Sequence, residues 1–440
     1  LLRRISPQVG PQVYNIPAPQ LCPACQHRRR LSFFNERTLY RRRCDAGGGE
    51  IISVYSPDCK IPVYSSDAWW GDSWEALSFG REVDLKRSFF EQLNELRLAV
   101  PAQALKVVNC ENCDYNNTLT NSRNCYLVFS GSDCEDAYYC HDSISLKDCV
   151  DVWWSRDIEL SAHIFGSAGL YNCWYCARCG NSNGLWFCRD CIGCSDCLGC
   201  SNLSNKQFHI FNVEYPKEDY QRFVAKLNRG SYKQIQTLLK QSSDHFESQP
   251  QRGCVVEHSE NCSGDLIYRS KNCAGCFTVS DCEDSRFLLE CGRLKDSYGL
   301  VRVYDCEGLV YDSISADFVF HSAFLLQCSG CSDSYYCMEC INLKNCFGCV
   351  GLRDREYCIF HRAYSKEEYH GILASLLDSM QKRGEWGEFF PARLSPFGYN
   401  ETLAATVFAL DEKQARKAGF NWNEAEKPSP RVAGLTPASR

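Results

Sequence analysis

The 440-residue sequence has no long apolar run. It contains no stretch of about 18 apolar residues, so no helical membrane span is predicted. It also lacks a charged and then apolar leader that ends in small residues, so we expect a cytoplasmic protein. The chain begins at Leu1 without methionine, which leaves open a leader or part of a domain upstream.

Catalytic motifs are missing as well. There is no G-x-G-x-x-G after a strand, no phosphate-binding loop, no H-E-x-x-H and no G-x-S-x-G. C-x-x-C-H is absent, which removes covalent haem, and the nine histidines show no register of a base with a nucleophile. We therefore predict a protein without enzymatic activity.

Cysteine, in contrast, is abundant. The chain has 32 cysteines, whereas disulfide scaffolds are usually short and exported. Without an export signal, we expect reduced thiols that act as metal ligands or as small buried hydrophobic groups. With 44% hydrophobic and 13% aromatic residues, the chain can bury substantial cores. Its net charge of -6 argues against a protein that coats nucleic acid over its whole surface.

The chain contains an internal duplication. NCYLVFSGSDCED at 124–136 matches NCAGCFTVSDCED at 272–284, an offset of 148. CRDCIGCSDCLGC from 188 matches CMECINLKNCFGC from 337, and YPKEDY from 215 matches YSKEEY from 364. The sequence therefore predicts two copies of one cysteine-rich unit, each followed by a helix.

A shorter period runs inside the first copy. Asn or Asp recurs in steps of 15 and 9, which sum to 24, and cysteine usually follows it. We expect each 24-residue module to form one coil of a β-solenoid, with Asn and Asp at the corners and the next residue pointing inward. The predicted structural ladder comprises Cys110, Cys125, Cys134, Cys149, Cys173, Cys197, Cys273, Cys282, Cys306 and Cys346.

Metal ligation is the rival explanation of these cysteines. C-x-x-C-x-x-C resembles the spacing of iron–sulfur proteins, but the ferredoxin motif ends in cysteine followed by proline. Here Cys197 precedes Leu and Cys200 precedes Ser, which favours packing over iron–sulfur binding. A redox protein that uses the ladder stays the alternative function.

The predicted fold is mainly β, with two tandem β-solenoid lobes, capping helices and an N-terminal module that resembles a zinc ribbon. Ser365 and Glu368 form a capping-box pattern at the start of one helix, and 241–253 reads as a polar linker. The expected parts are an N-terminal module at 1–84, a capping helix at 85–108, a first lobe at 109–212, a helical connector and linker at 213–253, a second lobe at 254–361, a helix and extension at 362–425 and a disordered tail at 426–440.

The N-terminal module carries a candidate zinc site. Cys22 and Cys25 form a C-P-x-C knuckle, and Cys44 and Cys59 follow it. Such knuckles commonly supply half of a tetrahedral zinc site. The second knuckle is defective because Gly47 stands where another thiolate is expected, so Cys59, His27 or a knuckle upstream of Leu1 would complete the ligand set.

Arginines lie between these cysteines, interleaved with aromatic residues. Such a pattern can bind phosphates and stack on bases, so nucleic acid or the ribosome is a candidate partner; a solvated, partly ion-paired face is the commoner outcome. The residues are Arg28, Arg29, Arg30, Arg37, Arg41, Arg42 and Arg43.

The chain also resembles a known group of proteins. CPACQHRRRLSFFNERTLYRRRC (22–44), VYSSDAWWGDSW (63–74), the doubled lobes and GEWGEFFPARLSPFGYNET (384–402) resemble uncharacterised cysteine-rich zinc-ribbon proteins of small-genome candidate-phylum bacteria. The resemblance covers nearly the whole chain and implies a zinc ribbon at the front, but no activity. We predict a non-enzymatic binding or scaffold protein that presents its lobes to a macromolecular partner, most readily a protein; the oligomeric state stays open.

Overall fold

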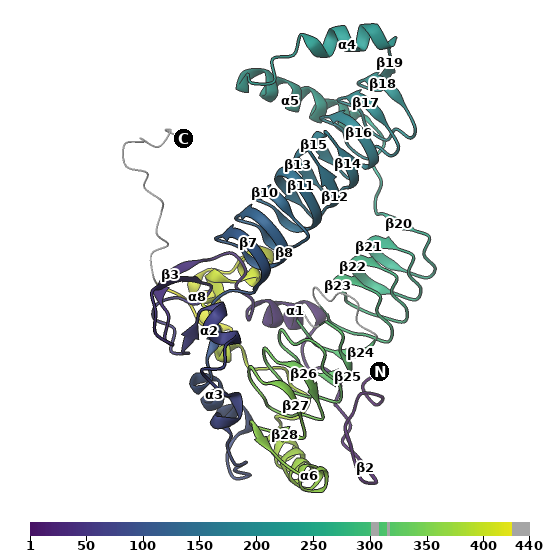
Figure 1. The fold of residues 1–440 in the computed structure, drawn as a ribbon. Helices are drawn as coiled ribbons and strands as arrows, with labels where there is room; N and C mark the ends of the chain where they lie inside the picture. Colours follow the sequence, from purple (N-terminus) through teal and green to yellow (C-terminus); the bar gives the residue numbers. More distant parts are fainter. Residues whose placement is uncertain (301–307, 315–316, 425–440) are drawn as a thin grey trace.

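The computed structural model describes residues 1–300, 308–314 and 317–424 (Figure 1). Its fold is mainly β, as predicted, and its two largest parts are stacks of parallel strands. Cys306 and the predicted tail at 426–440 lie outside the described residues. No helix in the described ranges is both long and apolar enough to cross a membrane.

The first stack, which we define as β7 to β18, belongs to a 13-stranded sheet that β19 ends in antiparallel pairing. Its strands are β7 (Val107–Asp114), β8 (Asn117–Tyr126), β9 (Phe129–Ser132), β10 (Glu135–Tyr138), β11 (His141–Trp153), β12 (Arg156–Glu159), β13 (Ala162–Phe165), β14 (Ala168–Tyr171), β15 (Trp174–Ala177), β16 (Gly180–Trp186), β17 (Ser195–Leu198) and β18 (Gln207–Ile210), followed by β19 (Val213–Glu214).

The repeating unit of this stack is half as long as we predicted. Each residue pairs in parallel with the residue 12 positions later, as in Cys113 with Cys125 and Cys197 with His209. Every third residue has a positive φ, so each 12-residue unit, which we call a coil, contains four such corners. The predicted steps of 15 and 9 together span two coils, because Asn and Asp occupy two of the four corners in most coils.

The residue after each corner points inward, as predicted. The interior of the first stack is a column of Cys, Leu, Val, Ile and Ser side chains. A buried serine accepts a hydrogen bond from the next coil, as Ser122 Oγ does from the Cys134 N–H at 3.0 Å. Of the predicted ladder, Cys110 is half-buried, and eight members are buried: Cys125, Cys134, Cys149, Cys173, Cys197, Cys273, Cys282 and Cys346.

The second stack, which we define as β20 to β28, follows the same plan with interruptions. Its register step is one residue shorter where Ser263 pairs with Ala274 and one residue longer where Tyr298 pairs with Tyr311, between runs of the regular step. Its strands are β20 (Val256–Glu257), β21 (Ser263–Tyr268), β22 (Ala274–Ser280), β23 (Leu289–Gly292), β24 (Gly308–Tyr311), β25 (Phe320–Ala323), β26 (Ile341–Lys344), β27 (Arg353–Glu356) and β28 (Cys358–Ile359), and β29 (Arg362–Ala363) pairs antiparallel with β28.

The helices differ from expectation in two places. The 3-10 helices are η1 (Ala76–Phe79), η2 (Ala392–Leu394) and η3 (Tyr399–Glu401), and the α-helices are α1 (Pro23–Leu31), α2 (Ser66–Trp70), α3 (Phe89–Ala99), α4 (Lys217–Ala225), α5 (Tyr232–Ser248), α6 (Lys366–Arg383), α7 (Leu403–Val407) and α8 (Glu412–Lys417). The capping box at Ser365 is present. The linker prediction was wrong for 241–248, because α5 continues through these residues with Leu238 and Ser242 on its buried side.

The predicted capping helix before the first stack packs elsewhere. Phe89 of α3 contacts the rings of Tyr336, Phe347 and Phe360 in the second stack, at centroid distances of 5.1, 5.3 and 5.4 Å. Phe89 and Phe90, which are adjacent at the start of α3, pack against the aromatic side chains of the second stack, and this explains the difference. The α3 helix therefore covers the second stack.

The N-terminal region contains short strands and one hairpin. The strands are β1 (Gln8–Val9), β2 (Gln12–Val13), β3 (Tyr40–Arg43), β4 (Glu50–Ser53), β5 (Val63–Tyr64) and β6 (Ala102–Gln103). β3 and β4 form an antiparallel hairpin, which is the ribbon-like element of this region. The C-P-x-C knuckle lies outside it, at the start of α1, where Cys22 is the N-cap and Pro23 the first helical residue.

Candidate functional site

Aromatic side chains gather on one outer side of the first stack. They occupy two neighbouring positions of the 12-residue repeat, so the regular register places them in columns, which are interrupted where Val150, Asp151, Ala162 and His163 stand at these positions. We call this set the aromatic strip. Its members are Tyr115, Tyr126, Tyr138, Tyr139, Trp174, Tyr175, Trp186 and Phe187. Tyr126, Tyr138, Tyr139 and Trp174 are exposed, Tyr139 by as much as 54%.

The rings of the strip stack on one another near the end of the stack. Tyr175 lies between His163 and Phe187, at centroid distances of 4.3 and 4.8 Å and interplanar angles of 14° and 2°. Trp174 stacks on Trp186 at 5.7 Å and 14°. Stacked rings of this kind add to the stability gained from burial, so these columns form a rigid surface.

A pocket of about 300 Å³ opens where α5 folds back over this surface. Figure 1 shows α5 beside β15 and β16, beyond the turn from α4. Trp174, Tyr175, Trp186 and Phe187 form one wall, and Leu227, Ile235 and Leu238 the other. Asn172, Asn228, Gln234 and Arg229 supply polar groups, which is the usual composition of a small-molecule site.

Arg229 provides the formal charge of this pocket. Its guanidinium lies 4.0 Å from the centre of the Trp186 ring, a cation–π contact. In the described part of the chain, no carboxylate lies within ion-pair distance of it. The pocket is therefore apolar and aromatic, with a positive group at its exposed edge.

A second cluster lies where the N-terminal region meets the first stack. Glu36, His141 and Asp142 form the one group of three potential metal ligands within the described ranges. His141 Nε2 is 2.7 Å from a Glu36 oxygen, and His141 Nδ1 is 2.9 Å from an Asp142 oxygen. Ser130 donates a hydrogen bond to Glu36, and Arg37 contacts both His141 and Glu36.

The ring of His141 lies among two carboxylates and a guanidinium. Burial lowers the pKa of His141, but hydrogen bonds with Asp142 and Glu36 outweigh it, so the pKa is raised. A metal ion bound to one ring nitrogen would need both carboxylates on that side of the ring. Here they contact opposite nitrogens, and Arg37 Nη2 lies 3.0 Å from Nδ1 and 2.7 Å from Nε2. The donors, as arranged, do not surround a single metal position.

The four predicted zinc ligands are not gathered into one group. Cys22 Sγ accepts a hydrogen bond from the Cys25 N–H at 3.4 Å, so this pair is close. Cys44 accepts one from the Ser65 N–H at 3.3 Å, and Cys59 packs beside the core around Val54 and Ile61. Among the residues that the structure describes, no three of these thiols meet as ligands. Zinc at this site stays a prediction.

The arginines predicted to bind nucleic acid mostly have partners inside the chain. Arg30 is buried and pairs with Asp312, and Arg29 lies 3.1 Å from Glu388. Arg28 stacks on Phe420, Arg37 on Trp153, and Arg41 on Tyr115; Arg42 pairs with Asp45 at 2.8 Å, and Arg43 is exposed at the end of β3. Four of the seven therefore pair with carboxylates, whereas Arg28 and Arg41 contact aromatic rings, which leaves their charge in place, and Arg43 is exposed.

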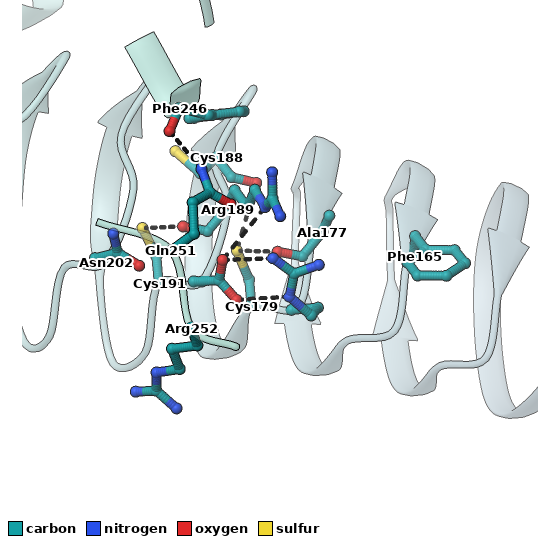
Figure 2. Close-up of polar contacts among 12 residues, drawn as sticks. Phe165, Ala177, Cys179, Cys188, Arg189, Cys191, Asn202, Phe246, Gln251 and Arg252 are labelled. Carbon is teal, nitrogen blue, oxygen red and sulfur yellow. Dashed lines mark hydrogen bonds and ion pairs between the residues drawn. The ribbon is translucent and has the colours of Figure 1, made fainter. Parts of the chain in front are cut away.

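The ladder thiols act as hydrogen-bond donors in the core. Figure 2 shows Cys179, Cys188 and Cys191 among these contacts. Cys179 Sγ donates to the carbonyl oxygens of Ala177 and Cys188, at 3.5 and 3.6 Å. Burial raises the pKa of both Cys134 and Cys149 to about 11. These two thiols are protonated near neutral pH and therefore poor nucleophiles, whereas hydrogen bonds from Cys179 and Cys188 lower the pKa of Cys191 to about 4.

Sequence reasoning missed both clusters. The pocket had one usable signal, because the spacing from Trp174 to Trp186 is the same as the spacing from Tyr175 to Phe187. Glu36 and His141 are 105 residues apart, and no local pattern connects them.

Comparisons with known proteins leave the family open. No protein-family model matches the chain, and no curated protein matches it significantly. The resemblance to cysteine-rich zinc-ribbon proteins therefore stays a prediction, and the function has to be argued from the geometry.

Proposed function

We propose that this chain is a non-enzymatic binding or scaffold protein, and that its two stacks are β-solenoid lobes, the first of which presents the aromatic strip to a protein partner. The parallel pairing at a constant step and the corners at every third residue support the solenoid. A solenoid offers a long, rigid surface built from repeated units, which suits it to binding extended partners.

The strip is the observation that carries this proposal. Four of its aromatic residues are exposed on one face of regular structure, whereas large exposed side chains are usually scattered singly. Tyr and Trp are enriched in the centres of protein interfaces. From Tyr126 to Trp174 the strip spans four coils, or about 19 Å at the usual strand spacing, a length that suits a protein segment.

The charge around the strip indicates the chemistry of the partner. Residues 109–160 contain ten acidic and three basic residues. These acidic residues are distributed over several sides of the stack, so this part of the stack as a whole disfavours nucleic acid and favours a partner with basic side chains. We therefore expect a protein segment that presents apolar and basic groups.

The alternatives have weaker support. Redox chemistry through the ladder would need accessible thiolates, but the ladder thiols are mostly buried and donate hydrogen bonds. Attachment to nucleic acid would need free arginines, and most of them have internal partners. A zinc ion would require Cys44 or Cys59 to join Cys22 and Cys25.

A peptide-display experiment tests the proposal. A library of random peptides displayed on phage is selected on the full chain and then screened against the variant Tyr126→Ser/Tyr138→Ser/Tyr139→Ser. We expect enriched peptides that combine aromatic and basic residues and that lose binding to this variant. Ile144→Ser/Ile192→Ser is the matched control, since it removes exposed apolar groups on another side of the stack. Peptides that bind the strip variant and the wild type equally would refute the proposal.

A further inference from the structure

Three rings of the pocket wall have an aromatic counterpart in the second stack. The match of 188–212 with 337–361 sets an offset of 149. Tyr175 and Phe187 then correspond to Phe324 and Tyr336, which stack at 4.6 Å and 19°, much as Tyr175 and Phe187 do. Trp186 corresponds to Tyr335, whereas Trp174 corresponds to Ala323. The two stacks thus carry similar rings at three of these four places.

In the second stack an indole ring of the chain itself covers this place. The ring of Trp386 lies 6.4, 6.3 and 6.1 Å from the rings of Phe324, Tyr335 and Tyr336. Its side chain is 5% exposed, and its Nε1–H donates to the Asn15 carbonyl at 3.0 Å. A planar aromatic group with a polar anchor therefore fits this surface.

In the first stack, the equivalent place is the pocket of about 300 Å³ under α5. Trp174 stacks on Trp186 through one ring face, and its strand neighbour on the other side is the small residue Ala162. In the described residues no other ring contacts Trp174, and its side chain is 37% exposed. The pocket that Trp174 lines, with its volume of about 300 Å³, has room for one more planar ring.

The charge at the edge of the pocket indicates which polar group the ligand carries. Arg229 contributes the formal charge and, within the described chain, has no carboxylate partner. A ligand with a carboxylate on a short arm would place its ring against the aromatic wall and its charge beside the guanidinium.

We propose that this pocket binds a small planar aromatic carboxylate of about indole size, which lies against Trp186 and Phe187 as Trp386 lies against Tyr335 and Tyr336 in the second stack. The proposal goes beyond the scaffold function, because it concerns a small molecule and the covered end of the strip. It also stands or falls separately, since Tyr126, Tyr138 and Tyr139 lie outside the pocket.

Calorimetric titration of the full chain with indole-3-acetate and with neutral indole tests this inference. We expect saturable one-to-one binding of both, with indole-3-acetate the tighter. Arg229→Gln should weaken indole-3-acetate about fivefold, because Arg229 lies at an exposed edge where ion pairs are modest, and it should leave indole nearly unchanged. Tyr138→Ala is the matched control, three coils before Trp174 in the same column, and should change neither affinity.

A second variant keeps the test decisive if Arg229→Gln affects folding. Ile235→Trp places an indole on the opposite wall of the pocket and should abolish binding of both compounds without lowering the thermal midpoint. Absence of saturable binding to the wild type would overturn the proposal. Equal affinity for indole and indole-3-acetate would overturn the assignment of an anion, and undiminished binding to Ile235→Trp would overturn the location.

Discussion

The two stacks share a sequence pattern but differ in what covers them. In the second stack, α3, α6 and the segment around Trp386 and Phe390 bury the aromatic columns in the largest core of the molecule. In the first stack, the corresponding side is exposed along β8 to β13 and covered only near its end, by α4 and α5. The first stack also keeps an unbroken register, whereas the second does not.

This difference indicates a division of labour between stability and recognition. A regular coil that bonds to its neighbours on both sides is stable without an outer cover, so its face is available for a ligand or partner. The second stack has shorter paired segments and register shifts, and the chain supports it with a large aromatic cover. Substitutions at matched positions can test this interpretation.

The largest difference in stability between the two stacks is expected when one aromatic ring is removed from each. Trp386→Ala should lower the free energy of unfolding by about 3–5 kcal/mol, because a buried ring leaves a cavity against Tyr335 and Tyr336. Trp174→Ala should cost less, about 1–2 kcal/mol, since the ring is 37% exposed and its removal opens the surface rather than a closed cavity. Urea unfolding followed by circular dichroism measures both values. Equal losses would contradict the division of labour.

The buried histidine of the first stack should matter more than a half-exposed histidine of the second. His141→Gln should cost about 2–3 kcal/mol, because the buried Asp142 and Glu36 carboxylates each lose one partner while Glu36 keeps Arg37. His321 pairs with Asp333 at 2.6 Å near the surface, so His321→Gln should cost well under about 1 kcal/mol.

The pH dependence of this contribution has a defined sign. The pKa of His141 is raised above 6.5 in the folded chain, by hydrogen bonds that outweigh burial. Its stabilisation is therefore fully present below the ordinary pKa and is lost as the pH rises through the raised value. Urea unfolding at about pH 6 and about pH 9 should show a larger loss for the wild type than for His141→Gln. The same pH dependence in both chains would contradict this assignment.

Overpacking of the ladder should affect both stacks alike. Cys188 and Cys337 are equivalent and fully buried, and leucine at either position should cost about 1–3 kcal/mol by forcing the coils apart. Serine should be tolerated better, because its hydroxyl can donate to the same carbonyl oxygens. Chemical denaturation of the four variants tests this. A loss confined to the second stack would show that the interiors are not equivalent.

A modest effect, equal in the two stacks, is expected at the corners. Asn124 and Asn272 are equivalent, both have a φ of 53°, and each donates to an Asp at the same corner of the next coil, at 3.1 and 2.9 Å. Replacement of either by alanine should cost about 1–2 kcal/mol through left-handed strain, and glycine should recover much of the loss. Thermal unfolding of the matched pairs provides the measurement. A corner effect in one stack only would break the equivalence of the coils.

The sequence was informative about the interior and less so about coil length. Asn and Asp mark corners because they tolerate left-handed backbone, and the cysteines after them are inside, as predicted. The coil length was misjudged because the other corners carry residues such as Trp154, Leu160 and Tyr175, which seldom adopt positive φ. Stacking on neighbouring coils holds these residues there, and that is a tertiary effect.

The candidate sites were beyond sequence reasoning for a different reason. Glu36 and His141 meet only when the N-terminal region docks on the first stack, and the pocket exists only because α5 folds back. The arginines of α1 looked available in the sequence, but Arg30 pairs with Asp312, a residue 282 positions away. Long-range pairing of this kind leaves no local periodicity.

The uniform register of the first stack has an evolutionary consequence. A duplication or deletion of exactly one dozen codons would add or remove a single layer, shift the terminal helices by about 4.8 Å along the axis, and leave every remaining thiol facing the same neighbours. Such insertions or deletions would lengthen or shorten the exposed face by one coil at a time, and both ends of the lobe would stay intact. Tolerance of such in-frame changes should be higher in the first lobe than in the second. In the second lobe the register shifts place each layer against a particular part of the covering helices and segments.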